Sequence, residues 1–140
     1  VERHEAGPAM EMCARSVILS AGLVSLMADD NYNCALAHAV CYGLQHFEHV
    51  EREYLHGDLV AYGTLVQLAV DGQLDKAREL RAFLVSLGTP VTLAQMRVPL
   101  EKTALHDALI EATTGPDMAH IPYPVTQDMV FDAMRRVETL

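Results

Sequence analysis

One segment constrains the fold more than any other. Leu59–Val70 reads LVAYGTLVQLAV and would be apolar around nearly its whole circumference as a helix. A helix of this kind is typical of a core position in which other helices enclose it. Apolar residues recur at helical spacing on both sides of the segment, and few runs show the alternation of a strand. The sequence therefore predicts an all-α fold with Leu59–Val70 at its centre and Gly63 allowing a close neighbour.

Capping signals give the expected boundaries of the other helices. Asn33 is a candidate N-cap for a helix that places Leu36, Val40, Leu44 and Phe47 on one face. A second helix of this kind ends at Gly88, the residue type best suited to a left-handed C-terminal cap. Pro99 is expected at the first position of a further helix, which ends at Gly115-Pro116, and Thr126 is expected to cap the last one. The expected buried faces are Leu74, Ala77, Leu80, Phe83, Leu84 and Leu87; Leu100, Ala104, Leu105, Ala108, Leu109 and Ala112; and Met129, Val130, Ala133, Met134 and Val137.

The most apolar stretch near the N-terminus is Ser16–Ala28, within a helical segment of about Ala9–Ala28. It is shorter than the ~20 residues that a membrane-spanning helix needs, and Asp29-Asp30 follow it directly. We therefore expect a buried core helix and no membrane association.

Length and charge narrow the class of protein. The chain has 140 residues, enough for one domain, expected over 1–140. Ten Lys and Arg against 19 Asp and Glu give a net charge of −9, with no basic cluster longer than Arg135-Arg136. Nucleic acid and anionic membranes are therefore poor partners. Three cysteines without zinc-ribbon spacing favour a reduced thiol set and a cytoplasmic location.

Two sets of side chains have helical spacing that would bring them to one side. Cys34, His38 and Cys41 form the first, and His49, Glu53 and His56 form the second. The first set is either a packing face of small residues with a hydrogen-bonded histidine or part of a metal site. The second is either a solvated surface or a ligand set. Spacing alone leaves both alternatives open.

Three motifs in a fixed order carry a resemblance to a known family. Ala35–Leu44 reads ALAHAVCYGL and is similar to the first histidine motif of the iron-containing alcohol dehydrogenases. Tyr54–Leu68 resembles their second histidine motif, particularly that of glycerol dehydrogenases, in which His-Gly and an acidic residue open a long apolar helix. Leu87–Gln95, LGTPVTLAQ, is similar to a third family segment. Together the motifs cover about Ser16–Gln95.

The resemblance implies a fold and a cofactor. This chain is similar to the C-terminal domain of dehydroquinate synthase-like and iron-containing alcohol dehydrogenases, a multi-helical orthogonal bundle that holds a divalent metal. In the family a separate N-terminal α/β domain binds NAD. No Gly-rich phosphate-binding turn or βα pattern is present in this sequence, so NAD is expected only through such a domain. The chain is expected to be a C-terminal fragment, inactive alone.

The resemblance also implies site residues. One aspartate and two histidines bind zinc or iron in the family; His38 and His56 match the histidines, and the aspartate is expected upstream of Val1. Where relatives often carry another histidine, this chain has Cys41 and Tyr42, so Tyr42 either replaces a proton relay or lines the substrate pocket, as Cys41 also could. No catalytic residue besides the metal ligands is expected. Asp58 is interpreted as a capping group, favoured by the helix dipole.

These observations predict the metal-binding half of a glycerol dehydrogenase-like, NAD-dependent oxidoreductase that acts on a small alcohol or polyol. Two alternatives remain. One is a non-catalytic helical binding or assembly module that retains the fold. The other is a self-contained metal site built from Cys34, His38, Cys41 and His56. A domain without its partner would also expose an apolar face, so a homo-oligomer is a further expectation.

Overall fold

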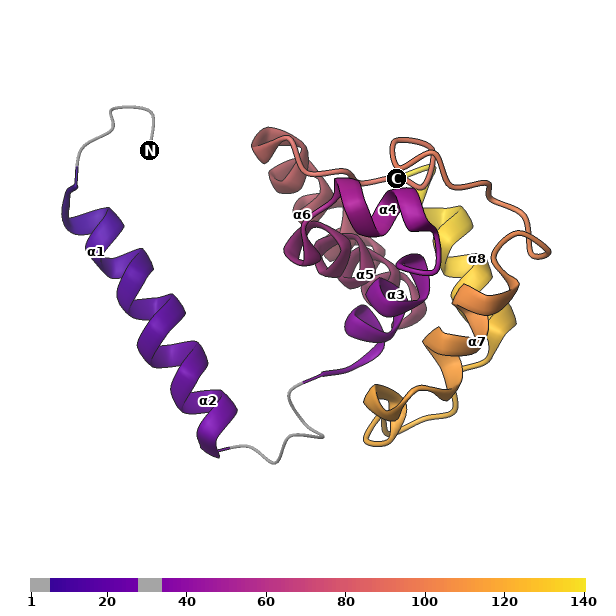
Figure 1. Cartoon of the computed structure of the whole chain (residues 1–140), viewed down its shortest axis with the longest axis horizontal. Coiled ribbons are helices and arrows are strands. Elements are labelled where there is room, and N and C mark those ends of the chain that lie inside the picture. The colour runs from indigo at the N-terminus through magenta and orange to yellow at the C-terminus, as the bar shows by residue number, and fades with distance from the viewer. Residues whose placement is uncertain (1–5, 28–33) are drawn as a thin grey trace. The chain divides into compact units, whose positions relative to one another are not determined.

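The computed structural model describes residues 6–27 and 34–140, and every regular element in those ranges is a helix (Figure 1). This confirms the predicted all-α class. The chain divides into two compact units, residues 1–33 and 34–140. The elements are α1 (Pro8–Arg15), η1 (Ser16–Ser20), α2 (Ala21–Met27), α3 (Leu36–Leu44), α4 (Glu48–Glu53), α5 (His56–Val70), α6 (Leu74–Leu87), α7 (His106–Thr114), η3 (Pro116–Met118) and α8 (Gln127–Val137).

In the first unit, α1, the π-helical turn η1 and α2 follow one another over Pro8–Met27. None of these residues is buried, and Leu26 and Met27 are 85% and 84% exposed. The prediction of a buried core helix over Ser16–Ala28 is therefore wrong for its described residues, because no other element of this unit packs against them. The helical stretch Pro8–Met27 agrees with the expected segment of about Ala9–Ala28. By its length and a mean hydropathy of 1.4 it could span a membrane, a criterion that core helices of soluble proteins and signal sequences also meet.

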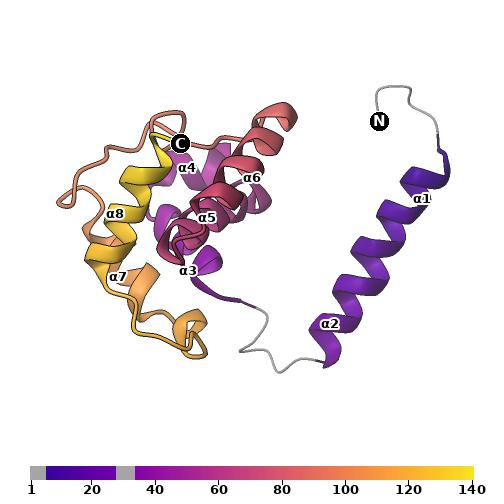
Figure 2. The same ribbon diagram turned by 180° about the vertical axis from the view of Figure 1, so that it is seen from behind.

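The second unit is built around α5, as predicted. α5 packs against α3, α6 and α8, and α3 packs in turn against α7 (Figures 1 and 2). The largest fully buried side chains include Tyr62, Leu65, Leu44 and Leu105. The core thus gathers residues from α3 to α8 around one central helix, as the apolar circumference of Leu59–Val70 requires.

Close helix contacts depend on glycine. A Cβ on Gly63 would overlap the backbone carbonyl of Ala37, so only glycine allows α5 to approach the start of α3 this closely. Gly43 has the same role toward α7, where a Cβ would lie 2.5 Å from the carbonyl oxygen of Ala108. The first turn of α3 is also tied to α5 by a hydrogen bond from the Ala37 amide to Oε1 of Gln67 (3.1 Å). This bond satisfies an amide that has no partner within its own helix.

Some boundaries follow the sequence signals and others do not. Gly88 ends α6 in the left-handed conformation (φ 77°), and the Thr126 side chain accepts a hydrogen bond from the Met129 amide at the start of α8. Both caps were predicted. The cap of α3 is Ala35, and Asn33 lies outside the described residues. Phe47, expected on the face of α3, instead precedes α4.

The predicted helix from Pro99 begins later than expected. α7 starts at His106, and residues 102–105 form a turn, so Leu100 and Ala104 lie outside the helix. Leu105 is nevertheless buried, because the turn delivers it to the core. On α6, Ala77 and Leu84 are buried as predicted, whereas Phe83 and Leu87 are 58% and 62% exposed. The neighbouring elements therefore cover only part of the apolar face of α6.

Candidate metal site

The two histidines of the family motifs lie beside each other. His38 is on α3 and His56 is the first residue of α5. Their ring centroids are 5.6 Å apart, although many residues separate them in the chain. The packing of α3 on α5, with Gly63 against Ala37, brings them together.

Cys41 and Tyr42 complete this cluster. Tyr42 is 39% exposed, and its ring centroid lies 6.4 Å from that of His38 and 6.0 Å from that of His56. Cys41 is fully buried beneath them. Its Sγ lies 3.5 Å from Nδ1 of His56 and donates a hydrogen bond to the His56 carbonyl oxygen at 3.9 Å. Tyr42 therefore lies beside both histidines, and Cys41 contacts His56 alone among the two.

Burial shifts the pKa of both the Cys41 thiol and the Tyr42 hydroxyl upward. Burial raises the pKa of the Cys41 thiol to about 11. Burial also raises the pKa of the Tyr42 hydroxyl, and the negative charge of Asp117 adds to this effect.

Asp117 is a neighbour of the site that sequence reasoning missed. It lies on η3, which packs against α3. The pKa of Cys34 is raised by burial and then by the charge and hydrogen bond of Asp117. Because Asp117 follows Gly115-Pro116, its local sequence indicates only a helix end. Its place beside α3 depends on the tertiary fold.

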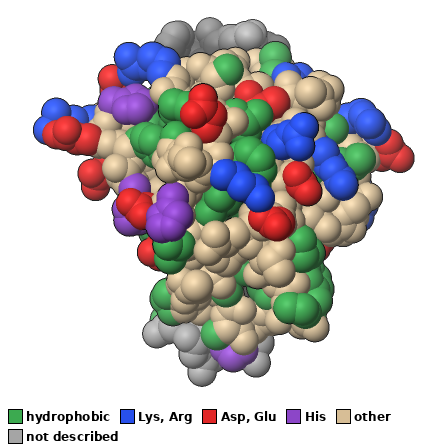
Figure 3. Space-filling view, turned by 90° about the vertical axis from the view of Figure 1, so that its right-hand side faces the viewer, with side chains coloured by type: hydrophobic (Ala, Val, Ile, Leu, Met, Phe, Trp, Pro, Cys, Tyr) green, Lys and Arg blue, Asp and Glu red, His purple; other side chains and the backbone are tan. Residues whose placement is uncertain are grey.

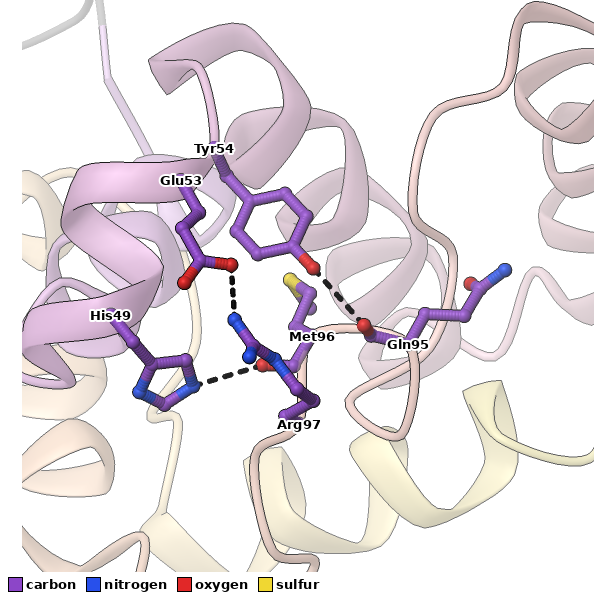
Figure 4. A network of polar contacts seen from close by, with 6 residues as sticks. All are labelled: His49, Glu53, Tyr54, Gln95, Met96 and Arg97. Atoms are coloured by element: carbon purple, nitrogen blue, oxygen red, sulfur yellow. Dashed lines mark hydrogen bonds and ion pairs between the residues drawn. The ribbon is translucent and has the colours of Figure 1, made fainter.

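The second set of spaced residues does not converge. His49 and Glu53 lie on α4, whereas His56 begins α5 after the extended residue Tyr54. His49 and Glu53 face the loop after α6 instead (Figure 4).

The contacts of α4 with that loop form a polar network (Figure 4). Nε2 of His49 lies 3.0 Å from the Met96 carbonyl, and the Tyr54 hydroxyl donates to the Gln95 carbonyl at 3.0 Å. Arg97, in the left-handed conformation with φ 58°, forms an ion pair with Glu53. These residues connect α4 to the loop that contains Gln95, Met96 and Arg97, and they do not belong to the cluster of His38 and His56.

Asp58 has the capping position that was predicted. Its Oδ2 accepts a hydrogen bond from the Leu55 amide at 3.3 Å, at the N-terminus of α5. A carboxylate in the first turn also interacts favourably with the helix dipole. This contact orders the turn that presents His56.

The histidine pair suits a divalent metal, because neutral imidazole is a good ligand for zinc and iron. The pair supplies two ligands. Within residues 6–27 and 34–140, no group of three or more His, Cys, Asp or Glu side chains is arranged to hold a metal ion. The self-contained site of Cys34, His38, Cys41 and His56 is therefore not formed there: Cys34 precedes α3 and interacts with Asp117. The residues fit a partial site that needs a further ligand.

The surface around α7 and α8 shows no large patch of a single charge (Figure 3). Basic and acidic side chains are interspersed on this face. Ion pairs join Lys102 to Asp128 (2.5 Å) and Arg135 to Asp132 (3.7 Å).

Comparison with curated proteins finds relatives that are dehydrogenases. No protein-family model matches the chain. Among curated proteins, it is 34% identical to hydroxycarboxylate dehydrogenase A of Escherichia coli K12 over 89% of its length. It is 30% identical to the glycerol dehydrogenases of Escherichia coli O6:H1 and Thermotoga maritima, over 95% and 99% of its length.

These matches cover 34%, 36% and 37% of the relatives, so the chain spans about a third of their length. The chain is therefore a homologue of glycerol dehydrogenases and a hydroxycarboxylate dehydrogenase, in agreement with the resemblance to iron-containing alcohol dehydrogenases that its motifs carry.

Proposed function

We propose that this chain is the metal-binding helical part of a glycerol dehydrogenase-like, NAD-dependent oxidoreductase that acts on a small alcohol or polyol. The observation that carries the proposal is the meeting of His38 and His56, with ring centroids 5.6 Å apart, at the two positions that match the family's histidine motifs. The dehydrogenase relatives support it. A cytoplasmic location, the orthogonal-bundle architecture of the family's C-terminal domain and a single domain over 1–140 belong to the same proposal.

The proposed chemistry assigns roles to the residues of this chain. A bound zinc or iron would supply a Lewis acid for the substrate oxygen. His38 and His56 would bind the metal through their imidazole rings, and the partly exposed Tyr42 lies beside both rings. The third ligand and the NAD site lie outside the residues named here. Two histidines hold a metal more weakly than a complete set of three protein ligands.

The test is a titration of the 140-residue chain with Zn²⁺ and, separately, Fe²⁺ by calorimetry. We expect weak binding of one ion per chain, lost in both His38→Ala and His56→Ala. His46→Ala is the matched control, because His46 is an exposed histidine on the turn after α3 and lies outside the cluster. Binding that survives both substitutions, or that His46→Ala also abolishes, would contradict the metal assignment.

A non-catalytic helical module is the second candidate. The observation that favours it is the absence of a three-ligand group from the described residues. Its distinguishing result is a chain that binds neither ion at any accessible concentration but keeps its helical fold by circular dichroism. Turnover of a small polyol with NAD⁺ by a longer protein containing this chain, abolished by His38→Ala, would exclude the module.

A further inference from the structure

Within the described part of the chain, the Cys41 thiol has two hydrogen-bond contacts, and both are with His56. Its Sγ lies 3.5 Å from the ring atom Nδ1 and 3.9 Å from the carbonyl oxygen of the same residue. The thiol is fully buried, whereas the histidine is exposed at the start of α5. Cys41 therefore contacts the inner nitrogen of a ring whose remainder reaches the surface.

Because the thiol has one hydrogen, it can donate to only one of these two partners at a time. A thiol has one weak donor and a weakly accepting sulfur, and a carbonyl oxygen can only accept. When the S–H points to the His56 carbonyl, the sulfur lone pairs are left to accept from Nδ1–H. We propose that Cys41 is a positioning residue that holds His56 in the tautomer with its proton on Nδ1.

This tautomer leaves the lone pair on Nε2, the nitrogen that does not face Cys41. Metal-binding histidines commonly donate their other N–H to a neighbouring group, which fixes both the tautomer and the ring orientation. This orienting role rests on the proposed function: in the proposed metal site, Cys41 is the group that orients His56. The tautomer is a property of the chain without metal, so its test is independent of metal binding.

The experiment is ¹⁵N NMR of the metal-free 140-residue chain, at a pH above the ordinary pKa of histidine so that the rings are neutral. The imidazole nitrogen shifts distinguish the two tautomers. We expect His56 to carry its proton on Nδ1 in the native chain and in Cys41→Ser, since a hydroxyl also donates and accepts. Cys41→Val, which keeps an apolar side chain of similar size in the core, should lose this preference. His38 provides the internal reference in the same spectra.

A mixed or Nε2-protonated His56 in the native chain would overturn the proposal, as would an unchanged tautomer in Cys41→Val. Circular dichroism shows whether each variant is folded; the native spectrum alone can overturn the proposal even where Cys41→Val does not fold. Zn²⁺ titration supplies a second readout: loss of such orienting partners elsewhere weakens metal binding about 10–100-fold. We expect a loss of about tenfold in Cys41→Val and recovery in Cys41→Ser.

Failure of the proposed metal-binding function and failure of the positioning role of Cys41 give different results. If His56 has its proton on Nδ1 but the chain binds no metal, the positioning role stands and the proposed function fails. If metal binds through His38 and His56 with equal affinity in Cys41→Val, the proposed function stands and the role of Cys41 is wrong.

Discussion

At the scale of single residues, Tyr62 has the most unusual environment in the core. It is the largest fully buried side chain, and its hydroxyl has no hydrogen-bond partner in the part of the chain that the structure describes. The nearby Glu138 carboxylate accepts instead from the Leu93 amide at 2.6 Å. An unpaired buried hydroxyl lowers the free energy of unfolding, because its hydrogen bonds to water are lost without replacement.

We therefore expect Tyr62→Phe to increase the free energy of unfolding by about 1 kcal/mol, since it removes the unpaired hydroxyl and keeps the ring. Tyr62→Ala should decrease it by about 3–5 kcal/mol, the usual range for deletion of a large aromatic core side chain. Urea denaturation followed by circular dichroism measures both. A clear loss of stability in Tyr62→Phe would indicate that the hydroxyl has a partner.

The raised pKa values of three groups predict a loss of stability in alkali. Burial raises the pKa of Cys41 to about 11, and that of Tyr62 well above its ordinary value of 10. A hydrogen bond to Asp71, then burial, raises the pKa of Tyr123 to about 12. Each group holds its proton more tightly in the folded than in the unfolded state. Its stabilisation is therefore complete below the unfolded-state pKa and is lost as the pH rises through the folded-state pKa.

The urea midpoint should accordingly fall as the pH rises from about 9 to about 12. The urea midpoint of Tyr62→Phe should fall less steeply with pH, because this variant lacks one of the three groups with a raised pKa. Tyr54→Phe is the control, since its hydroxyl is on the surface network. A midpoint that stays constant over this range would be inconsistent with the assigned shifts.

Family motifs mark His38 and His56 as candidate ligands, and the fold places the two rings side by side. The motifs also make Cys41 a pocket candidate, but its contact with His56 depends on where α3 crosses α5 and is not encoded locally. Asp117 shows the same limit: its position beside Cys34 is fixed by the packing of η3 on α3.

At the scale of elements, the contact of α3 with α5 determines whether the two histidines meet. Gly63 packs against the backbone of Ala37, where a Cβ would overlap the carbonyl oxygen. A backbone cannot move away as a flexible side chain can. Any larger residue at position 63 must therefore separate the helices.

We expect Gly63→Ala to decrease the free energy of unfolding by about 1–3 kcal/mol, the usual cost of overpacking. Gly57→Ala, in the same helix, is the matched control, because a Cβ there meets nothing within 4 Å. It should increase stability by up to about 1 kcal/mol, since alanine favours a helix more than glycine. Thermal unfolding compares the pair. Equal effects of the two substitutions would contradict the assigned close contact.

Helix periodicity predicted which segments are helical better than it predicted what covers them. The caps at Gly88 and Thr126 are local and were found in advance. Phe83 and Leu87 continue the apolar stripe of α6, yet they are exposed because the neighbouring elements cover only part of the helix. The late start of α7 is also non-local, since Leu105 reaches the core through a turn.

At the scale of the whole molecule, the two units differ in how they are stabilised. Every residue of the buried core cluster lies between Leu36 and Val137, within the second unit. The described helix of the first unit has large apolar side chains that are more than half exposed, including Val17, Ile18, Leu23 and Val24. The second unit therefore has its own core, whereas the helix over Pro8–Met27 has many exposed apolar side chains and none that is buried.

This difference predicts how a shortened chain behaves. We expect residues 34–140 alone to remain folded, with a thermal midpoint close to that of the full chain, because no core side chain is removed. Exposed apolar surface promotes association, so the full chain should form dimers or larger species at concentrations at which residues 34–140 stay monomeric. Sedimentation velocity measures both states.

A variant of the full chain separates the apolar surface from chain length. Ile18→Lys with Leu23→Lys keeps all 140 residues and places two charges on the helix. Reduced association in this variant would assign self-association to the helix surface. If the variant and the full chain associate equally, another surface is responsible. If residues 34–140 unfold when isolated, the first unit contributes to the stability of the second, because the core of residues 36–137 is then insufficient on its own.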